Sequence, residues 1–430
     1  MQSTVPYNTC IGYTVNSESI WHYTRNMMYL FPKKKKRIYL DYAAATPLRK
    51  DVADVMRPYE RVHFANPSAI HSEGVFVRNT IEEARLRLAR LLKIRPAGVV
   101  FTGSGTESNN LAIIGLARYR YDQGCPYDEM EVVSTRIEHP SVLKSLEYLQ
   151  GLGVTVRYVD VNDQGLIVAE SLQKALSTKT ILVTFAYANS EVGVIQNVGK
   201  LARTVRSFAK EHEIDIAIHL DVAQAPLWLP CEIDRLHVDM MTLDAGKCYG
   251  PKGVGVLAMR HGIKISPVLY GGPQERGLRP ATENIPGIIG AAEALCIAQN
   301  TFKQRSKQVT ALRDRAIDTL LQIEGVILNG SKEYRIANNI NISIPGIDSE
   351  FAVVSLDVAG VACSTKSACS STEGGGSAVV KEISNDDTLA SSTIRFSLGE
   401  STTQKEIDIA IGILKRHIYK MREISKFDKN

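Results

Sequence analysis

The chain has 430 residues, of which 44% are hydrophobic and 23% are charged, and its formal net charge is +5. No apolar run approaches the roughly 20 residues of a membrane-spanning helix, so we expect no membrane association of that kind. The length exceeds what one hydrophobic core usually serves, which predicts two domains. The cysteines are odd in number, scattered and without a CxxC pair, which argues against a disulfide framework or a zinc site and favours a reducing cytoplasm. They are Cys10, Cys125, Cys231, Cys248, Cys296, Cys363 and Cys369.

The first 37 residues differ from the rest of the chain. Residues 1–32 show no clear periodicity, and residues 33–37 form a run of five basic side chains. We expect an N-terminal extension over residues 1–37. A short basic run is usually a solvated tail, so direct nucleic-acid binding is not expected. Few acidic residues would permit a transit peptide, but arginine is too sparse to favour one.

Apolar runs alternate with helical patterns between residues 75 and about 260. This alternation predicts an α/β fold with a mostly parallel seven-stranded sheet between layers of helices. Ligands of such sheets bind beyond the carboxyl ends of the strands, so the loops that follow the strands are where chemistry is expected. The expected strands cover residues 98–102, 131–135, 154–159, 181–186, 216–220, 238–243 and 254–259.

Beyond about residue 300 there are fewer strands between longer helices. This pattern predicts a large domain over residues 38–300, whose first residues would pack on the small domain, and a smaller α+β domain over residues 301–430. The elements expected in the small domain are a helix over 305–324, strands over 339–344 and 393–398, and a final helix over 403–425.

Lys247 follows the expected strand 238–243, and Asp221 ends the strand before it. A lysine and an aspartate at two strand ends suit pyridoxal phosphate (PLP). The amine forms a Schiff base with the cofactor aldehyde, and the carboxylate pairs with the protonated pyridine nitrogen. The pair therefore predicts a PLP site at this edge of the sheet.

Three other strand ends carry polar groups. Gly105 and Thr106 lie in a glycine turn that runs into the helical pattern of residues 111–119; the amides at such a helix start favour phosphate, although the same turn more often serves as a plain connection. His139 could lie over a cofactor ring and move protons near neutral pH, or be structural. Asn189 could bond a ring substituent or a substrate carboxylate, or be a turn residue.

Two residues of the small domain suggest chemistry on an amino acid. Cys369 lies beside three consecutive glycines, which predict a mobile loop in which a thiol can act as a nucleophile. Cys363 lies in an apolar stretch and is expected to be buried. Arg395 is a charge within an expected strand, where its guanidinium either holds a substrate carboxylate in two places or forms a structural ion pair.

With these residues in this order, the chain resembles the cysteine desulfurases, in the class V aminotransferase group of fold-type I PLP enzymes. The match begins at residues 38–47 and runs to the C-terminal helix. The motifs that carry it are Asn66-Pro67-Ser68 with His71, Gly105-Thr106-Glu107-Ser108-Asn109, Glu138-His139, Asn189 with Glu191-Val192-Gly193, Asp221 with Gln224, Lys247 with Tyr249-Gly250-Pro251-Lys252-Gly253, Gly271-Gly272 with Glu275-Arg276-Gly277 and Arg279, Thr282, Ser367-Ala368-Cys369, and Ile394-Arg395-Phe396-Ser397.

The resemblance implies a role for each cofactor residue. Lys247 would hold PLP and move protons, and Asp221 would pair with the pyridine nitrogen. Gln224 would contact the ring hydroxyl and His139 would stack on the ring. The phosphate would lie on Gly105 and Thr106, with Thr282 reaching the phosphate of the neighbouring subunit in a homodimer.

The resemblance also implies the reaction. Asn189 and Arg395 would hold the carboxylate of L-cysteine, and Cys369 would take its sulfur as a persulfide and release alanine. The segment from Cys369 to Arg395 resembles the long-loop group, which serves iron–sulfur cluster assembly and tRNA thiolation. A scaffold or another sulfur-acceptor protein is the implied partner. The enzyme's own chemistry needs no metal, although Cys369 could ligate a cluster together with a scaffold.

One position departs from the family. Where its members usually have Ser-x-His-Lys, with serine and histidine on the phosphate, this chain has Asp244-Ala245-Gly246-Lys247. An ionised aspartate repels a phosphate dianion, so Asp244 is not expected to take the serine's role. Replacement of Gly246 by histidine is predicted to tighten PLP retention.

Other functions stay open on the sequence alone. A selenocysteine lyase, or a related class V lyase or transaminase, would use the same PLP residues, and Cys369 distinguishes a desulfurase from a simple transaminase. A non-catalytic sulfur-transfer scaffold would keep the fold, but the set of Lys247, Asp221 and His139 argues against it.

Overall fold

A computed structural model describes residues 37–365 and 376–427. The expectations for the extension before Arg37, and for Cys369 and its glycine loop, lie outside the described residues. A seven-stranded sheet in the order β2-β8-β7-β6-β5-β3-β4 forms the large part of the molecule. Only β8 runs against its neighbours; the other pairs are parallel. The strands are β2 Val99–Thr102, β3 Glu131–Thr135, β4 Thr155–Val159, β5 Thr180–Ala186, β6 Ala217–Asp221, β7 Met240–Asp244 and β8 Gly255–Met259.

All seven strands expected from the sequence are confirmed, with ends displaced by at most two residues. Their apolar residues alternate between the two faces of the sheet, as the two-residue period of a strand requires. Val132 and Leu182 belong to one core, whereas their neighbours Val133 and Val183 belong to the other. The predicted α/β fold with two covered faces is therefore confirmed.

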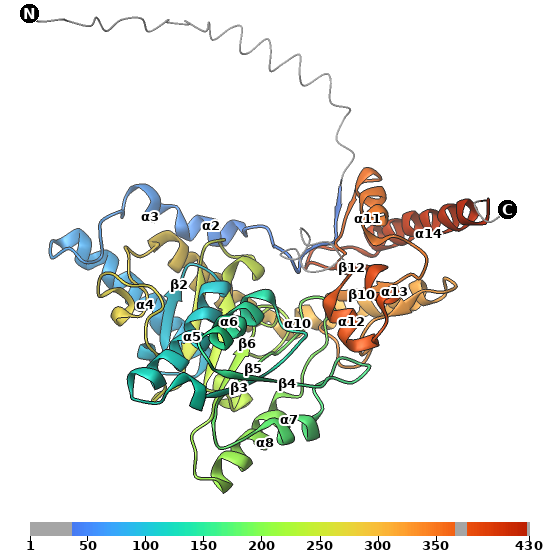
Figure 1. Ribbon diagram of the computed structural model, residues 1–430. Helices are drawn as coiled ribbons and strands as arrows, with labels where there is room; N and C mark the ends of the chain where they lie inside the picture. Colours follow the sequence, from blue (N-terminus) through green and yellow to red (C-terminus); the bar gives the residue numbers. More distant parts are fainter. Residues whose placement is uncertain (1–36, 366–375, 428–430) are drawn as a thin grey trace, which may run out of the picture.

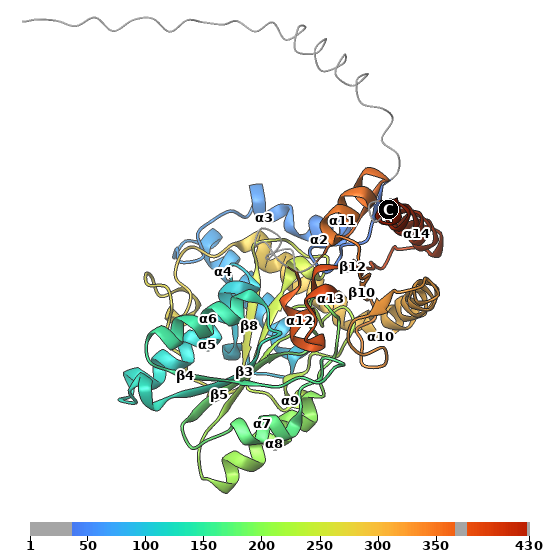
Figure 2. The same ribbon diagram turned by 45° about the vertical axis from the view of Figure 1, so that its right-hand side comes forward.

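Helices cover both faces of this sheet, as Figures 1 and 2 show. The core on one face is completed by α5 and α6, and the core on the other by α4, α7, α8 and α10. The helices of the large part are α2 Lys50–Met56, α3 Pro58–Arg61, α4 Ser72–Leu92, α5 Gly105–Asp122, α6 Pro140–Gly151, α7 Ala169–Ala175, α8 Val198–Glu211 and α9 Ile233–Leu236. Short 3₁₀ turns include η3 Ala245–Lys247 and η4 Gln274–Gly277.

Helix α10 (Ile285–Leu321) joins the two parts of the molecule. It packs on α2 and α4 of the large part and on α14 and β10 of the small part. The domain boundary expected at residue 300 thus falls inside a continuous helix, and the helix expected over residues 305–324 is the second half of α10. The change in sequence pattern near residue 300 did not reveal this, because α10 packs on elements of both parts within one continuous hydrophobic cluster.

The small part is built on the antiparallel sheet β12-β10-β9, which contains both strands expected there. A separate two-stranded sheet of the small part pairs β1 (Ile38–Tyr39), at the start of the described chain, with β11. The remaining elements are β9 Ile327–Leu328, β10 Asn339–Ser343, α11 Ser349–Val358, β11 Val361–Ala362, α12 Ala378–Ser384, α13 Asp387–Ser391, β12 Thr393–Ser397 and α14 Gln404–Phe427.

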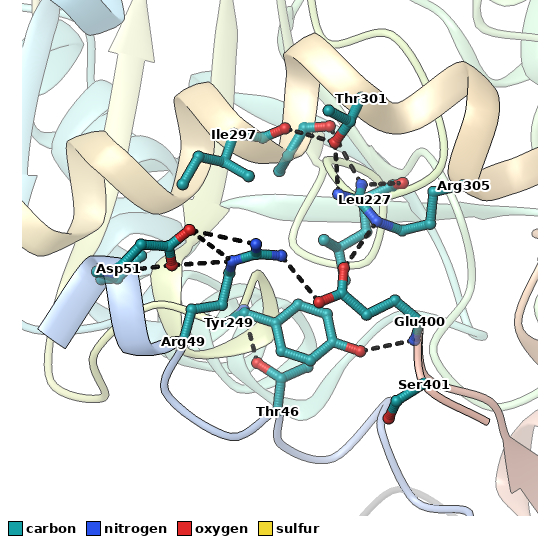
Figure 3. A network of polar contacts seen from close by, with 12 residues as sticks. Thr46, Arg49, Asp51, Leu227, Tyr249, Ile297, Thr301, Arg305, Glu400 and Ser401 are labelled. Carbon is teal, nitrogen blue, oxygen red and sulfur yellow. Dashed lines mark hydrogen bonds and ion pairs between the residues drawn. The ribbon is translucent and has the colours of Figure 1, made fainter.

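A polar network joins Glu400 of the small part to Tyr249, two residues after Lys247; Figure 3 shows Glu400 and Tyr249 within it. Glu400 accepts a hydrogen bond from Arg305 Nε (3.3 Å), and its backbone N–H donates to the Tyr249 hydroxyl (2.8 Å). The backbone N–H of Tyr249 donates to Thr46 Oγ1 (2.7 Å), and Tyr249 adopts a left-handed conformation with φ 59°. Because few non-glycine residues adopt this conformation, these bonds hold the chain in an unusual turn just after Lys247.

Candidate active site

A cavity of about 230 Å³ lies beyond the carboxyl ends of β5, β6 and β7. This is the edge at which the sequence predicted chemistry. The cavity brings together seven residues expected from the sequence: Gly105, Thr106, His139, Asn189, Asp221, Gln224 and Lys247. Its other lining residues are Ala44, Asn109, Ser141, Ala186, Ala188, Ser190, Ala223 and Asp244.

One side of the cavity, here called the Asp221 end, consists of Asp221, Asn109, Ser141 and His139. Asp221 is the last residue of β6; its Oδ1 accepts from the backbone N–H of Ala223 (2.9 Å) and its Oδ2 from Asn109 Nδ2 (2.9 Å). Asn109 also donates to Ser141 Oγ (2.8 Å), which lies 2.8 Å from His139 Nδ1. A chain of hydrogen bonds therefore fixes the carboxylate and the imidazole relative to each other.

His139 is held in one protonation state. It is the N-cap of α6, and its Nδ1 accepts the backbone N–H of Ser141 (3.1 Å). Burial, and then the nearby charge of Lys247, lowers the pKa of His139 below its usual value. The ring is thus neutral at pH 7, with its proton on Nε2, because Nδ1 serves as an acceptor.

His219 lies beneath Asp221 on the same face of β6, two residues earlier. Its side chain is fully buried, and its ring nitrogens lie 2.8 Å from Thr184 Oγ1 and 3.0 Å from Thr242 Oγ1. Burial lowers the pKa of His219 to about 4, so the ring is neutral. A neutral ring here leaves Asp221 without a cation directly below it.

Glu138 is a buried carboxyl group next to His139. Its Oε1 accepts a hydrogen bond from Thr135 Oγ1 (2.6 Å), and its Oε2 has no partner among the described residues. Burial raises the pKa of Glu138 to about 8, and the charge of Asp221 adds to this effect. Glu138 is therefore mainly protonated at pH 7, and no second negative charge stands beside Asp221.

A second group of residues, here called the Asp244 end, consists of Gly105, Thr106 and Asp244, which line the cavity, and of Gly246, which is bonded to Asp244. Helix α5 begins at Gly105, and its first bond between residues four apart runs from the N–H of Ser108 to the Ser104 carbonyl (3.1 Å). The amides of Gly105 and Thr106 precede that bond, so they are available to an anion.

A carboxylate already stands at this helix start. Asp244 is the last residue of β7, and its Oδ1 accepts the backbone N–H of Gly246 (2.8 Å). Its Oδ2 lies 3.2 Å from the position that a β-carbon on Gly105 would occupy. The departure noted in the sequence therefore lies beside Gly105, the first of the two residues whose amides are predicted to bind phosphate.

Gln224 lines the cavity between the two ends. Its Nε2 donates to the carbonyl of Ala43 (3.0 Å), which fixes the amide and leaves Oε1 as an acceptor. The 3₁₀ turn η3 places Lys247 in the same cavity, three residues after Asp244. The lysine thus lies within reach of both ends.

The two residues predicted to hold a substrate carboxylate are engaged within the protein. Asn189 Nδ2 donates to the carbonyl of Ile137 (2.7 Å). Arg395 on β12 is 1% exposed and does not line the cavity. Its guanidinium donates to Asp41 Oδ1 and to the Ser190 carbonyl, each at 2.9 Å, while Nε is buried without a partner among the described residues. The ion pair considered from sequence is present, and the carboxylate role stays a prediction.

Two further predicted residues are not part of the cavity as described. Thr282 is exposed and does not line it, so its role toward a neighbouring subunit stays a prediction. Cys369 lies outside the described residues. Cys363 is described, and burial raises the pKa of its thiol to about 12. A thiol with that pKa is unreactive near neutrality.

Sequence reasoning gave no role to Asn109, Ser141 or Asp41. Asn109 and Ser141 lie one helical turn or less from the predicted Thr106 and His139, and this proximity was the available signal. Asp41 is 354 residues from Arg395, its partner, and no local pattern connects them.

Comparison with known proteins identifies the family of the chain. The model of the aminotransferase class-V family matches residues 38–409. A protein named cysteine desulfurase IscS from Dictyoglomus turgidum is 39% identical over 91% of this chain and 97% of its own length. Cysteine desulfurase IscS 1 from Archaeoglobus fulgidus is 36% identical over 90% and 98%. The chain belongs to the cysteine desulfurase family of class-V aminotransferases.

Solved structures agree with this assignment. A NifS-like protein superposes with a TM-score of 0.81 at 30% identity, over 89% of this chain and 99% of its own.

Cysteine desulfurases and the class-V aminotransferases as a whole depend on PLP. In residues 37–365 and 376–427, no helix is long and apolar enough to cross a membrane, and no three His, Cys, Asp or Glu side chains are grouped to hold a metal ion.

Proposed function

We propose that this protein is a homodimeric, PLP-dependent L-cysteine desulfurase that converts L-cysteine to L-alanine and leaves the sulfur as a persulfide on Cys369. The observation that carries this proposal is the meeting of Lys247, Asp221 and His139 in one cavity. A lysine amine, a fixed carboxylate and a neutral imidazole at strand ends are the groups that PLP chemistry requires.

The donors and acceptors of the cavity fit PLP except at Asp244. Lys247 supplies the amine for the aldehyde, and Asp221 an acceptor for the protonated pyridine nitrogen. Gln224 keeps Oε1 as an acceptor for the ring hydroxyl, because its Nε2 is bonded to Ala43. The amides that begin α5 suit the phosphate. When bound, the cofactor would draw electrons away from the carbon atoms of the substrate.

The side chains at the Asp221 end then have separate tasks. Asp221 is held in place by two donors and would accept a hydrogen bond from the protonated ring nitrogen. His139 would stack on the ring and, being neutral, would donate a hydrogen bond from its Nε2–H without adding a second positive charge beside Lys247. The amine of Lys247 would move protons to and from the substrate carbon, because it is the only cation among the described residues that line the cavity.

The substrate carboxylate would lie near Asn189 and Arg395. Arg395 is held by Asp41 and by the carbonyl of Ser190, a residue that lines the cavity. A related structure, titled SspA in complex with cysteine, has a TM-score of 0.72 and 30% identity over 85% of this chain and 100% of its own. This supports a free amino acid as the substrate.

The sulfur step balances without an external oxidant. The Cys369 thiolate would attack the substrate sulfur, so that an S–S bond forms as the substrate C–S bond breaks. The bonding electrons pass to the substrate carbon, which takes up a proton and leaves as alanine. The persulfide would then serve an iron–sulfur scaffold, a tRNA-thiolation partner or another acceptor protein.

Thr282 is exposed, which fits a role at the cofactor of a second subunit in a homodimer.

We also expect a cytoplasmic setting, in keeping with the unpaired cysteines. Cys125, Cys231, Cys248, Cys296 and Cys363 are free among the described residues.

The test adds L-cysteine to the purified protein and follows alanine formation and a mass gain of one sulfur on the peptide that contains Cys369. Cys369→Ser should lose both the mass gain and sulfide release. Cys363→Ser is the matched control and should keep both, because its thiol is half-buried and has a raised pKa. Sulfide release at the normal rate from Cys369→Ser would contradict the proposal. Turnover of selenocysteine but not cysteine would favour a selenocysteine lyase.

A further inference from the structure

The Asp244 end of the cavity holds a negative charge where the proposed cofactor carries its own. Asp244 bonds Gly246 through Oδ1 (2.8 Å), whereas Oδ2 accepts no hydrogen bond from the described residues. That oxygen faces the first residue of α5, where the amides of Gly105 and Thr106 are available to an anion. A phosphate on these amides would share the space with a carboxylate oxygen.

The surrounding charges do not cancel this carboxylate. Lys247 is the only cation among the described lining residues, and it is committed to the cofactor aldehyde. Arg279 Nε is paired with Glu107 Oε1 (3.1 Å), and the amine of Lys252 donates to the Thr46 carbonyl. The other titratable groups that face Asp244 are His139, Asp221 and the buried thiol of Cys248.

A doubly charged phosphate and an ionised Asp244 repel each other in this space. A singly charged phosphate does not, because its remaining O–H can donate to Asp244 Oδ2 in a charge-assisted hydrogen bond. A free phosphate monoester takes up that proton near pH 6. The carboxylate would raise this value for the bound ester, since the proton then serves both groups.

We propose that Asp244 makes this site select the singly protonated form of the cofactor phosphate, so that the enzyme holds its cofactor more tightly as the pH falls from 8 toward 6. The inference rests on the proposed function, because it requires PLP in the cavity. It assigns Asp244 a role in cofactor binding that differs from the neutral serine of the family.

The test is the ³¹P NMR resonance of PLP in the full-length holoenzyme, recorded from pH 5.5 to 8.5. In the unsubstituted protein the bound phosphate should take up a proton within this range, at a pH above that of free PLP. In Asp244→Ser and Asp244→Asn the resonance should stay at the dianion position. Asp234→Asn removes an equal charge from an exposed position of α9, where Asp234 pairs with Arg260, and should behave like the unsubstituted protein.

The rate of PLP loss on dialysis gives a second readout. Asp244→Ser should lose PLP about tenfold more slowly than the unsubstituted protein at pH 8, and the ratio should approach one near pH 6. All variants keep the bond between PLP and Lys247, so the ratio of their loss rates reports the effect of the Asp244 carboxylate alone. Thermal unfolding of each variant confirms that it is folded.

Two results would overturn the inference and leave the proposed function intact. One is a bound phosphate that stays dianionic in the unsubstituted protein throughout the range. The other is an Asp244→Ser holoenzyme that titrates like the unsubstituted one. A protein that shows no PLP absorbance under any condition would overturn the proposed function, and the inference with it.

Discussion

The Asp221 end and the Asp244 end of the cavity each present one aspartate from the last residue of a parallel strand, but their surroundings differ. Asp221 has both oxygens bonded to donors, and its neighbours Glu138 and His219 are neutral at pH 7. Asp244 has one bonded oxygen, and the other faces the start of α5. The end of a strand therefore fixes the position of a carboxylate. The hydrogen-bond partners and neighbouring charges of that carboxylate determine whether it attracts or repels a ligand.

The largest effect is expected at Lys247, which serves both ends. Lys247→Ala should lower cysteine turnover by at least about 10³-fold, since both the covalent hold on PLP and the proton carrier are removed. Lys252→Ala, five residues later, should keep the PLP absorbance band because its amine bonds only the Thr46 carbonyl. Absorbance spectra and alanine production check both variants, and a Lys247→Ala protein with normal turnover would refute the assignment.

The next largest effect separates the two aspartates. Asp221→Asn should lower kcat by about 10²–10³-fold, because the charge that stabilises the protonated ring nitrogen is lost. Asp244→Asn removes the same charge at the other end and should instead slow PLP loss. Steady-state kinetics and the PLP content after dialysis measure the two effects. Similar behaviour of the two variants would mean that the two ends are not used differently.

Glu138 should make stability depend on pH. Its pKa is about 8 in the folded protein against 4.5 ordinarily, so between these values the folded state keeps a proton that the unfolded state has released. Stability relative to Glu138→Gln should therefore fall as the pH rises from 5 to 8, by up to about 1.4 kcal/mol per pH unit. Denaturant unfolding at several pH values measures this difference.

Glu147→Gln, on the exposed side of α6, is the matched control, because Glu147 is exposed and pairs with Lys144 at the surface. This control should show no comparable slope. An equal dependence in the unsubstituted protein and in Glu138→Gln would mean that Glu138 is not the group that titrates.

The smallest effect is expected at Gly246. Gly246→His would restore a donor beside the phosphate and should slow PLP loss by about tenfold, which is the size of one charge-assisted hydrogen bond. A β-carbon there would meet Asp244 Oδ1 at 3.2 Å, so Asp244 must shift slightly to admit it. Cofactor loss on dialysis is the measurement, and an unchanged rate would show that Gly246 does not limit retention.

The sequence by itself determined the seven strands and the edge of the sheet at which chemistry gathers. Apolar periodicity is local, so it reports β3 or β6 without knowledge of the rest of the chain. Lys247, Asp221 and His139 could be brought together in advance because the carboxyl ends of parallel strands meet at one edge. The sequence did not predict that α10 continues across the expected domain boundary, since this depends on its packing against elements of both parts.

The partners of the site residues were decided only by the tertiary structure. Asn109 reaches Asp221 across 112 residues, and Arg395 reaches Asp41 across 354. The approach of Asp244 to Gly105 likewise joins β7 to the start of α5. Such contacts depend on how helices and strands pack, and one residue's neighbours in sequence carry no information about them. The sequence therefore identified the charged residues of this site. The packing of the chain determined which of those charges have bonded partners.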